Sequence, residues 1–176
     1  HQVVPLDPAL AARNDLVTFV GAYHVDGLAV ILDPEQLGAG EIALDRLAGR
    51  KVAVEMHSLA EVYLGAVQGG RFQSTLARCR RPEETVQALR DGTVQAVMGL
   101  RGQLEALLGP DRERFPLVEI PLPGLPAPRW PLGLAVRRSA VELAAAVESI
   151  VAAGLRDGTI ARIFAAHGVT HRPPEA

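Results

Sequence analysis

The sequence predicts an α/β protein in which helices cover both faces of a largely parallel sheet. Apolar runs of strand length alternate with amphipathic segments of helix length through residues 45–136, and this alternation is typical of βαβ units. The run 52–54 is apolar throughout, as expected of a strand that is covered on both faces. Apolar residues make up 48% of the 176 residues, which is enough to form a core.

Composition argues against several classes of function. The net charge is −2, so there is no electrostatic basis for binding nucleic acid or an anionic membrane. No apolar run approaches the roughly 20 residues of a membrane-spanning helix, and we expect no direct membrane insertion. The first residues show no signal-peptide pattern. The single cysteine, Cys79, cannot form an intrachain disulfide.

The first part of the chain is expected to hold two strands separated by a loop. Residues 16–20 and 28–32 are rich in β-branched and aliphatic side chains, which favour strands. We expect Gly21 to break the first strand, residues 23–27 to form a loop, and Asp33 with the following proline to end the second strand.

The next stretch predicts a buried strand, a tight loop and a helix. The loop 55–58 follows the strand 52–54, and Ser58 with Glu61 forms a capping box. In such a box the serine oxygen accepts from the amide of Glu61, and the glutamate accepts from the amide of Ser58. The helix should end near residue 68, where two glycines follow.

The rest of the chain continues the alternation. Strands are expected at 72–76, 94–98, 117–122 and 132–136, and helices are expected to start at Pro82, near 102, at Ser139 and at Thr159. Ser139 with Glu142 makes a second capping box, and Thr159 should cap the last helix. The helix after Ser139 should have one buried face, formed by apolar residues at helical spacing, namely Leu143, Val147, Ile150 and Val151.

Two loops are candidates for a binding site. The loop 55–58 offers amides, a hydroxyl and the His57 imidazole, and residues 99–101 also follow a buried strand and precede a helix. The carboxyl ends of parallel strands share one edge of a sheet, where ligands bind and helix N-termini favour anions. His57 fits a ligand donor and a solvent-exposed loop histidine equally well. Arg101 fits a ligand contact or, more readily, a solvated charge at a helix start.

Signals of catalysis, metal binding and cofactor binding are weak. The five histidines include no pair with zinc-ligand spacing in a helix, and Cys79 has no cysteine partner. The sequence contains no G-x-S-x-G elbow and no glycine-rich nucleotide loop. Glu83 and Glu84 lie at a helix start, where they complement the helix dipole. We therefore expect no metal, no cofactor and a binding function.

Six segments in sequence order carry a resemblance to a known family, and they are 13–27 (R…F-V-G-A-Y-H-V-D-G), 44–54 (L-D-R-L-A-G-R-K-V-A-V), 58–64 (S-x-x-E-x-Y-L), 88–97 (A-L-R-D-G-T-V-Q-A-V), 133–143 and 155–168. Together they resemble the family 3 extracellular solute-binding proteins, which are the periplasmic receptors of amino-acid-type ABC importers. The resemblance implies a small-molecule solute as ligand, a membrane permease of an ABC importer as partner, and a periplasmic location.

The resemblance also implies a fold and its division. The expected fold is of the periplasmic-binding-protein type II, with two lobes that are joined by crossovers and close on a ligand. Lobe one is expected to be incomplete in this sequence. Residues 1–33 would hold a remnant of lobe one and the first crossover. Residues 34–131 would form lobe two, and residues 132–176 would hold the second crossover and helices that return to lobe one.

The resemblance assigns ligand contacts residue by residue. Arg13 matches the arginine that grips a carboxylate with two hydrogen bonds, and Ser58 matches the hydroxyl at the start of the lobe-two helix. His57 stands where the family has a glycine, which narrows the anion pocket. The expected ligand-binding residues are Arg13, Tyr23, Glu55, His57, Ser58, Leu100 and Arg101.

The resemblance places a substitution at the ammonium-binding position. Leu100 stands where the family has the aspartate that holds a substrate ammonium, and Gln95 replaces the aspartate of a second motif. Losing such a partner costs about 1.5–3 kcal/mol. An anionic, neutral or apolar ligand, such as a small carboxylate, is therefore favoured over a plain α-amino acid, or no ligand binds at all.

Other functions stay open on the sequence. Proteins of this type also resemble accessory periplasmic partners of quinoprotein dehydrogenases, which need no transported ligand. A dehydratase of the cyclohexadienyl type has the same fold, and His57 and Glu55 are the only local candidates for its acid or base. Effector domains of regulators and sensor kinases share the two-lobed architecture.

Overall fold

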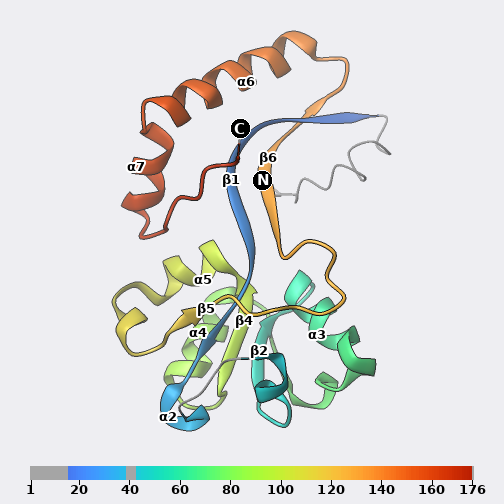
Figure 1. Cartoon of the computed structure of the whole chain (residues 1–176), viewed down its shortest axis with the longest axis vertical. Coiled ribbons are helices and arrows are strands. Elements are labelled where there is room, and N and C mark those ends of the chain that lie inside the picture. Colours follow the sequence, from blue (N-terminus) through green and yellow to red (C-terminus); the bar gives the residue numbers. More distant parts are fainter. Residues whose placement is uncertain (1–15, 39–42, 176) are drawn as a thin grey trace. The chain divides into compact units, whose positions relative to one another are not determined.

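The computed structural model describes residues 16–38 and 43–175, and the chain divides into two compact units. Unit one comprises residues 1–26 and 129–176, and unit two comprises residues 27–128. Strand β1 (Val17–Leu32) begins in unit one and ends in unit two (Figure 1).

Unit two is built on a sheet in which β1 and four shorter strands are ordered β3-β2-β4-β1-β5. Strand β2 (Val52–Glu55) pairs in parallel with β3 (Leu76–Cys79) and with β4 (Ala96–Leu100). Strand β1 pairs antiparallel with β4 and with β5 (Leu117–Val118). The predicted α/β class and the parallel βαβ arrangement are confirmed.

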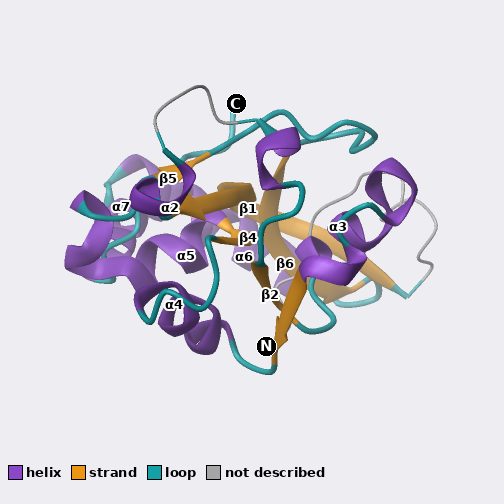
Figure 2. Cartoon of the chain, turned by 90° about the horizontal axis from the view of Figure 1, so that it is seen from below, coloured by secondary structure: helices purple, strands orange, loops and turns teal. Residues whose placement is uncertain are grey.

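Helices lie on both faces of this sheet. Helix α3 (Leu59–Gly70) lies on one side, and α4 (Pro82–Arg90) and α5 (Arg101–Leu108) lie on the other (Figure 2). In α3 the backbone leaves helical geometry at residues 67–69, close to the predicted end. Short helical turns connect these elements, and they are α2 (Pro34–Leu37), Leu44–Leu47, Gln73–Thr75 and Gly109–Glu113.

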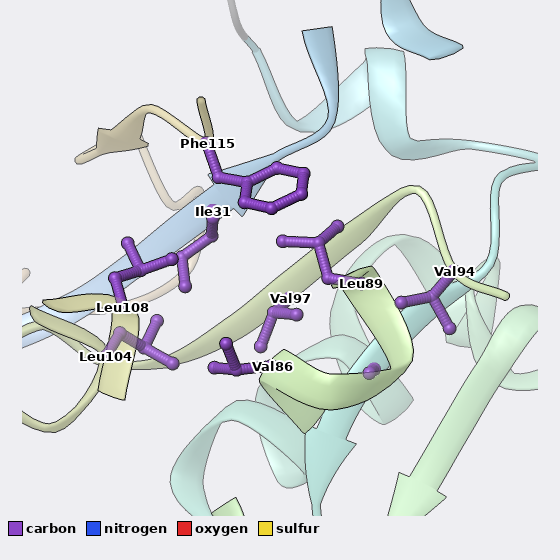
Figure 3. Close-up of a cluster of buried hydrophobic side chains, with 9 residues drawn as sticks. Ile31, Val86, Leu89, Val94, Val97, Leu104, Leu108 and Phe115 are labelled. Atoms are coloured by element: carbon purple, nitrogen blue, oxygen red, sulfur yellow. The ribbon is translucent and has the colours of Figure 1, made fainter. Parts of the chain in front are cut away.

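The core of unit two follows from strand alternation. Ile31, Val97 and Ala53 lie side by side on neighbouring strands and point to the face that α4 and α5 cover. They pack against Leu104 and other buried residues of this layer, with Phe115 beside them (Figure 3). Fully burying one such side chain contributes about 1.5–3 kcal/mol. The intervening residues are buried as well, so the prediction of a strand covered on both faces is confirmed.

Unit one contains the first part of β1, strand β6 (Arg129–Arg137), α6 (Val141–Arg156) and α7 (Thr159–Ala166). Strand β6 pairs with β1. Helix α6 packs closely on β1 at Gly21, whose amide donates to Glu148 Oε1 at 3.0 Å. Gly21 has φ +60°, and a Cβ there would lie 2.9 Å from Val151 Cγ2.

The prediction of two strands and a loop at the start of the chain was wrong. Residues 17–32 form one continuous strand, which accommodates Gly21 at its positive φ. The expected loop 23–27 is extended because it has a distant partner. The amide of Val25 donates to the carbonyl of Arg172 in the C-terminal tail at 2.8 Å.

Several predicted strands have different bounds. The strand predicted at 132–136 is longer and runs from Arg129 to Arg137. The segment predicted at 72–76 is a helical turn after the fully buried Phe72, and the strand starts only at Leu76. The strand predicted at 94–98 starts at Ala96. The strand predicted at 117–122 has two residues, because prolines on both sides remove backbone donors.

The second capping box and the buried face of α6 were also wrong. Ala140 is the N-cap of α6 and makes no side-chain hydrogen bond. Leu143 and Ile150 are 56% and 70% exposed, because the described part of unit one covers only the flank of α6 that faces Gly21. Gly158, rather than the predicted Thr159, is the N-cap of α7, and Asp157 Oδ1 accepts from the Thr159 amide at 2.8 Å.

Candidate functional site

The carboxyl ends of the three parallel strands of unit two lie on one edge of the sheet. Strand β2 lies between β3 and β4 and is parallel to both, so the loops that follow these strands share this edge. We call it the carboxyl edge and define it by residues 55–58, 79–81 and 100–101. Helices α3, α4 and α5 all begin there.

The loop after β2 contains the predicted cap in an altered form. Ser58 Oγ accepts from the Glu61 amide at 3.2 Å, which confirms the first half of the capping box. The second half was wrong by one residue. Glu61 Oε2 accepts from the amide of His57 at 2.6 Å, whereas the Ser58 amide donates to the carbonyl of Glu55 at 3.3 Å.

The backbone of His57 explains this difference. His57 has φ +62°, in the left-handed region that side chains with a Cβ rarely adopt. This turn directs its amide to the Glu61 carboxylate, while its imidazole is exposed. The hydrogen bond from His57 and a contact of 2.6 Å from Arg78 Nε to Glu61 Oε1 lower the pKa of Glu61 below its ordinary value.

The first turn of α3 offers hydrogen-bond donors to an anion. Within the described part of the chain, the amides of Leu59 and Ala60 have no hydrogen-bond acceptor. The Ser58 hydroxyl accepts from Glu61 and keeps its hydrogen for a further acceptor. Two amides and one hydroxyl at a helix N-terminus match a carboxylate, which the helix dipole also stabilises.

The loop after β4 carries a charge that is already compensated. The Arg101 guanidinium donates to both carboxylate oxygens of Glu105, at 2.8 and 3.2 Å, and its Nε lies 3.7 Å from Glu119 Oε1. Arg112 Nη1 also contacts Glu105, at 3.4 Å. The Glu105 side chain is only 4% exposed, so this group of residues fixes the Arg101 side chain rigidly beside Leu100.

The structure brings five of the seven predicted ligand-binding residues to the carboxyl edge, and they are Glu55, His57, Ser58, Leu100 and Arg101. Tyr23 lies in unit one, half-buried, with its ring centroid 6.4 Å from that of Phe164. Burial, and to a lesser extent the charge of Asp26, raise the pKa of Tyr23. Arg13 lies outside the described residues.

Sequence reasoning missed further groups at this edge. Arg80 follows β3, is exposed, and forms no ion pair among residues 16–38 and 43–175. It was overlooked because the strand before it was predicted four residues too early. Met56 and Leu59 expose apolar surface beside the loop, at 36% and 39%. The free amides of the α3 turn could have been deduced from the capping box, which satisfies only part of a helix start.

The described residues give no sign of a metal centre, since no group of three histidine, cysteine, aspartate or glutamate side chains among them could hold an ion. Cys79 is a half-buried free thiol whose pKa is raised by burial and by the charge of Glu84. In the same part of the chain, every helix is too short or too polar to span a bilayer.

Comparison with known proteins identifies the fold. No protein-family model matches the sequence, and no curated protein matches it. An ancestral cationic amino acid solute-binding protein matches with a TM-score of 0.73 and 17% identity over 94% of this chain and 66% of its own. An amino acid ABC transporter substrate-binding protein from Streptococcus pneumoniae, solved with L-arginine, matches with a TM-score of 0.68 and 14% identity over 90% and 62%.

A histidine kinase sensor domain with similarity to periplasmic binding proteins also matches, with a TM-score of 0.64 and 21% identity over 97% of this chain and 70% of its own. The chain therefore has the fold of the type II periplasmic binding proteins, as its motifs implied. Several of the matched structures are substrate-binding proteins of amino acid ABC transporters. The chain spans about two-thirds of the length of these structures.

Proposed function

We propose that the chain is a non-catalytic solute receptor that binds a small carboxylate at the carboxyl edge of unit two. The observation that carries this proposal is the first turn of α3, where two backbone amides and the Ser58 hydroxyl have no acceptor among the described residues. Hydrogen bonds to a charged group contribute about 1.5–3 kcal/mol each, and the helix dipole adds about 0.3–1 kcal/mol. A carboxylate in this position uses all of these interactions.

The residues around this turn favour a ligand without an ammonium group. Leu100, at this edge, has no charge. Gln95, which the sequence placed in the ammonium site, lies instead at the opposite, amino end of β4, where its side chain accepts from the Lys51 amide at 2.8 Å and donates to Gln36 at 2.9 Å. Met56 and Leu59 offer apolar contact to the body of a solute. These features support a carboxylate with an apolar tail, for which Glu55, His57 and Arg101 form the polar surroundings.

The wider role follows from the fold. The matched structures include substrate-binding proteins of ABC transporters, and this likeness supports a periplasmic receptor that delivers its solute to a membrane permease. In that role residues 34–131 act as lobe two, residues 1–33 and 132–176 belong to lobe one and the crossovers, and Arg13 and Tyr23 contribute ligand contacts from lobe one.

Calorimetric titration with two related ligands tests the proposed site. 4-Methylpentanoate is L-leucine without its ammonium group, and we expect it to bind more tightly than L-leucine. Replacing Ser58 by Ala should weaken 4-methylpentanoate binding by about tenfold or more, because a charge-assisted hydrogen bond is lost. The matched control is Ser74→Ala, which removes an exposed hydroxyl before the start of β3, at the opposite end of the parallel strands from this edge.

Two results would contradict the proposal. One is equal affinity of Ser58→Ala and the unaltered chain for 4-methylpentanoate, and the other is the absence of binding by any carboxylate. Because Ser58→Ala also removes a helix cap worth about 1 kcal/mol, the titrations are made well below the unfolding temperature of both variants.

A second candidate is the sensor domain of a signalling protein. It is favoured by the likeness to a histidine kinase sensor domain, which extends over 97% of this chain. In that role the same carboxyl edge binds the signal molecule. A transmembrane segment and a kinase encoded in the same polypeptide would distinguish this function from transport.

A further inference from the structure

The helices of unit one expose large apolar side chains. Among the residues that the structure describes, neither α6 nor α7 contains a buried residue. Six of the nine exposed large apolar side chains in this part of the chain belong to unit one, and they are Leu16, Leu134, Val141, Leu143, Ile150 and Ile163. Apolar side chains that gather on one face of a protein mark an interaction site.

On α6 the exposed apolar residues form a regular stripe. Its members follow one another at intervals of three, four and three residues, and they are Leu143, Ala146, Ile150 and Ala153, all exposed. This is the spacing of the a and d positions of a heptad, which lie on one face of a helix. Strand β1 contacts the adjacent flank, where Val151 lies beside Gly21, and Figure 1 shows β1 and β6 on only one side of α6. We call these four residues the α6 stripe.

The charges beside the α6 stripe complement those of a second copy of the same helix. Glu142 and Arg156 are two heptads apart, so both lie on the same flank of the stripe, at its two ends. Ser149 lies midway between them on that flank. Neither charged side chain forms a salt bridge within the described chain, although Arg156 interacts with the charge of the adjacent Asp157.

We propose that the α6 stripe is the interface of a homodimer, in which α6 packs antiparallel against α6 of a second copy of this chain. A two-fold axis near Ser149 places Glu142 of each copy opposite Arg156 of the other, and the two contacts are equal by symmetry. In a parallel pair the same flank would face Val147 and Gly154 on the other flank, and neither charge would have a partner. Charge complementarity therefore selects a second copy, in antiparallel orientation, as the occupant of this face.

The side chains of the α6 stripe suit close packing of two helices. In the antiparallel pair, Leu143 lies opposite Ala153 of the second copy, and Ile150 lies opposite Ala146, so each large side chain meets a small one. Helix axes pack about 8–10 Å apart, and alanines allow the shorter distances. Because four residues from each copy form the contact, the interface is small and the association should be weak. The stripe belongs to unit one, whereas the carboxyl edge belongs to unit two, so this proposal does not depend on solute binding.

Sedimentation equilibrium of the full chain tests the dimer directly. The average mass should rise from that of one chain towards that of two as the concentration increases from about 1 μM to about 1 mM. Ile150→Glu should weaken the association at least about a hundredfold, because two unpaired carboxylates would be buried in the interface. The matched control is Val141→Glu, which should leave the association unchanged. Val141 is also 70% exposed, but it lies about two and a half helical turns from Ile150 and therefore on the opposite side of α6.

Charge reversal tests the orientation of the two helices. Glu142→Arg and Arg156→Glu should each weaken the dimer about tenfold, because each variant alone places like charges opposite one another at two positions. An equimolar mixture of the two variants should associate about as tightly as the unaltered chain, since both pairs in the mixed dimer again have opposite charges.

The proposal is overturned if the chain stays monomeric up to about 1 mM, which would leave this face to a different protein, or if Val141→Glu weakens the association as much as Ile150→Glu does. A mixture that associates no more tightly than either charge variant alone would overturn the antiparallel arrangement. All four replaced side chains are exposed, so the variants should remain folded. Far-UV circular dichroism of each variant verifies this before sedimentation.

Discussion

Replacing His57 by Gly should stabilise the chain, although His57 lies in a candidate binding loop. His57 has φ +62°, and the left-handed conformation costs a residue with a Cβ about 1–2 kcal/mol. Glycine avoids this cost but loses about 0.5–1 kcal/mol more conformational entropy on folding. The bond from the backbone amide of residue 57 to Glu61 is kept. The net gain over a non-glycine residue is therefore about 1 kcal/mol.

The control is His57→Ala, which removes the imidazole and keeps the backbone strain. Urea unfolding followed by far-UV circular dichroism should place the midpoint of His57→Gly above that of His57→Ala. With a urea dependence of about 1–3 kcal/mol per molar, the difference should be about 0.3–1 M. Equal midpoints, or a lower midpoint for the glycine variant, would refute the assignment of strain to this residue.

Three further perturbations have defined outcomes. Glu105→Gln should lower the free energy of unfolding, measured in urea, by about 2–4 kcal/mol, because Arg101 and Arg112 both lose the buried carboxylate with which they pair. A decrease below about 1 kcal/mol would contradict this. Gly21→Ala should lower the unfolding temperature more than Gly38→Ala does, because both have positive φ but only the Gly21 Cβ meets a neighbour, Val151. The pKa of Glu61 lies below its ordinary 4.5 in the folded chain, so its stabilisation is present above that pH and is lost as the pH falls through the folded pKa. Glu61→Gln should therefore lose less stability than the unaltered chain below pH 4.5, and parallel pH profiles would disprove the linkage.

Local patterns predicted α4 and β2 closely because the signals for these two elements lie within each element. Pro82 and two acidic residues mark the start of α4, and α4 begins at Pro82 as predicted. The apolar run 52–54 predicted β2, which has only one residue more. These features depend on neighbours within a few positions, so a single sequence contains them.

Features that depend on distant residues could not be predicted in the same way. The extended conformation of residues 23–27 depends on a tail that is more than 140 positions away, as the bond from Val25 to Arg172 shows. The apolar residues of α6 have helical spacing and therefore predicted a buried face. Their spacing contains no information on which part of the chain covers that face.

The candidate site shows the same division. Ser58 and its cap follow from a local motif, and the structure places them as expected. The hydrogen bond from the His57 amide to Glu61 depends on the left-handed backbone conformation of His57, which the sequence pattern did not indicate. The main partner of Arg101 is Glu105, four positions away on the same helix, and this spacing could have been recognised in the sequence. The longer contact with Glu119, 18 positions away, depends on the tertiary fold.

Backbone-amide NMR of the full chain during titration with 4-methylpentanoate tests the carboxylate site most directly. The predicted result is that the largest chemical-shift changes occur at Leu59 and Ala60, whose amides have no acceptor in the described chain, and that Ser58→Ala diminishes them. Saturable binding that leaves these two amides unchanged, or no binding at all, would contradict the proposed site.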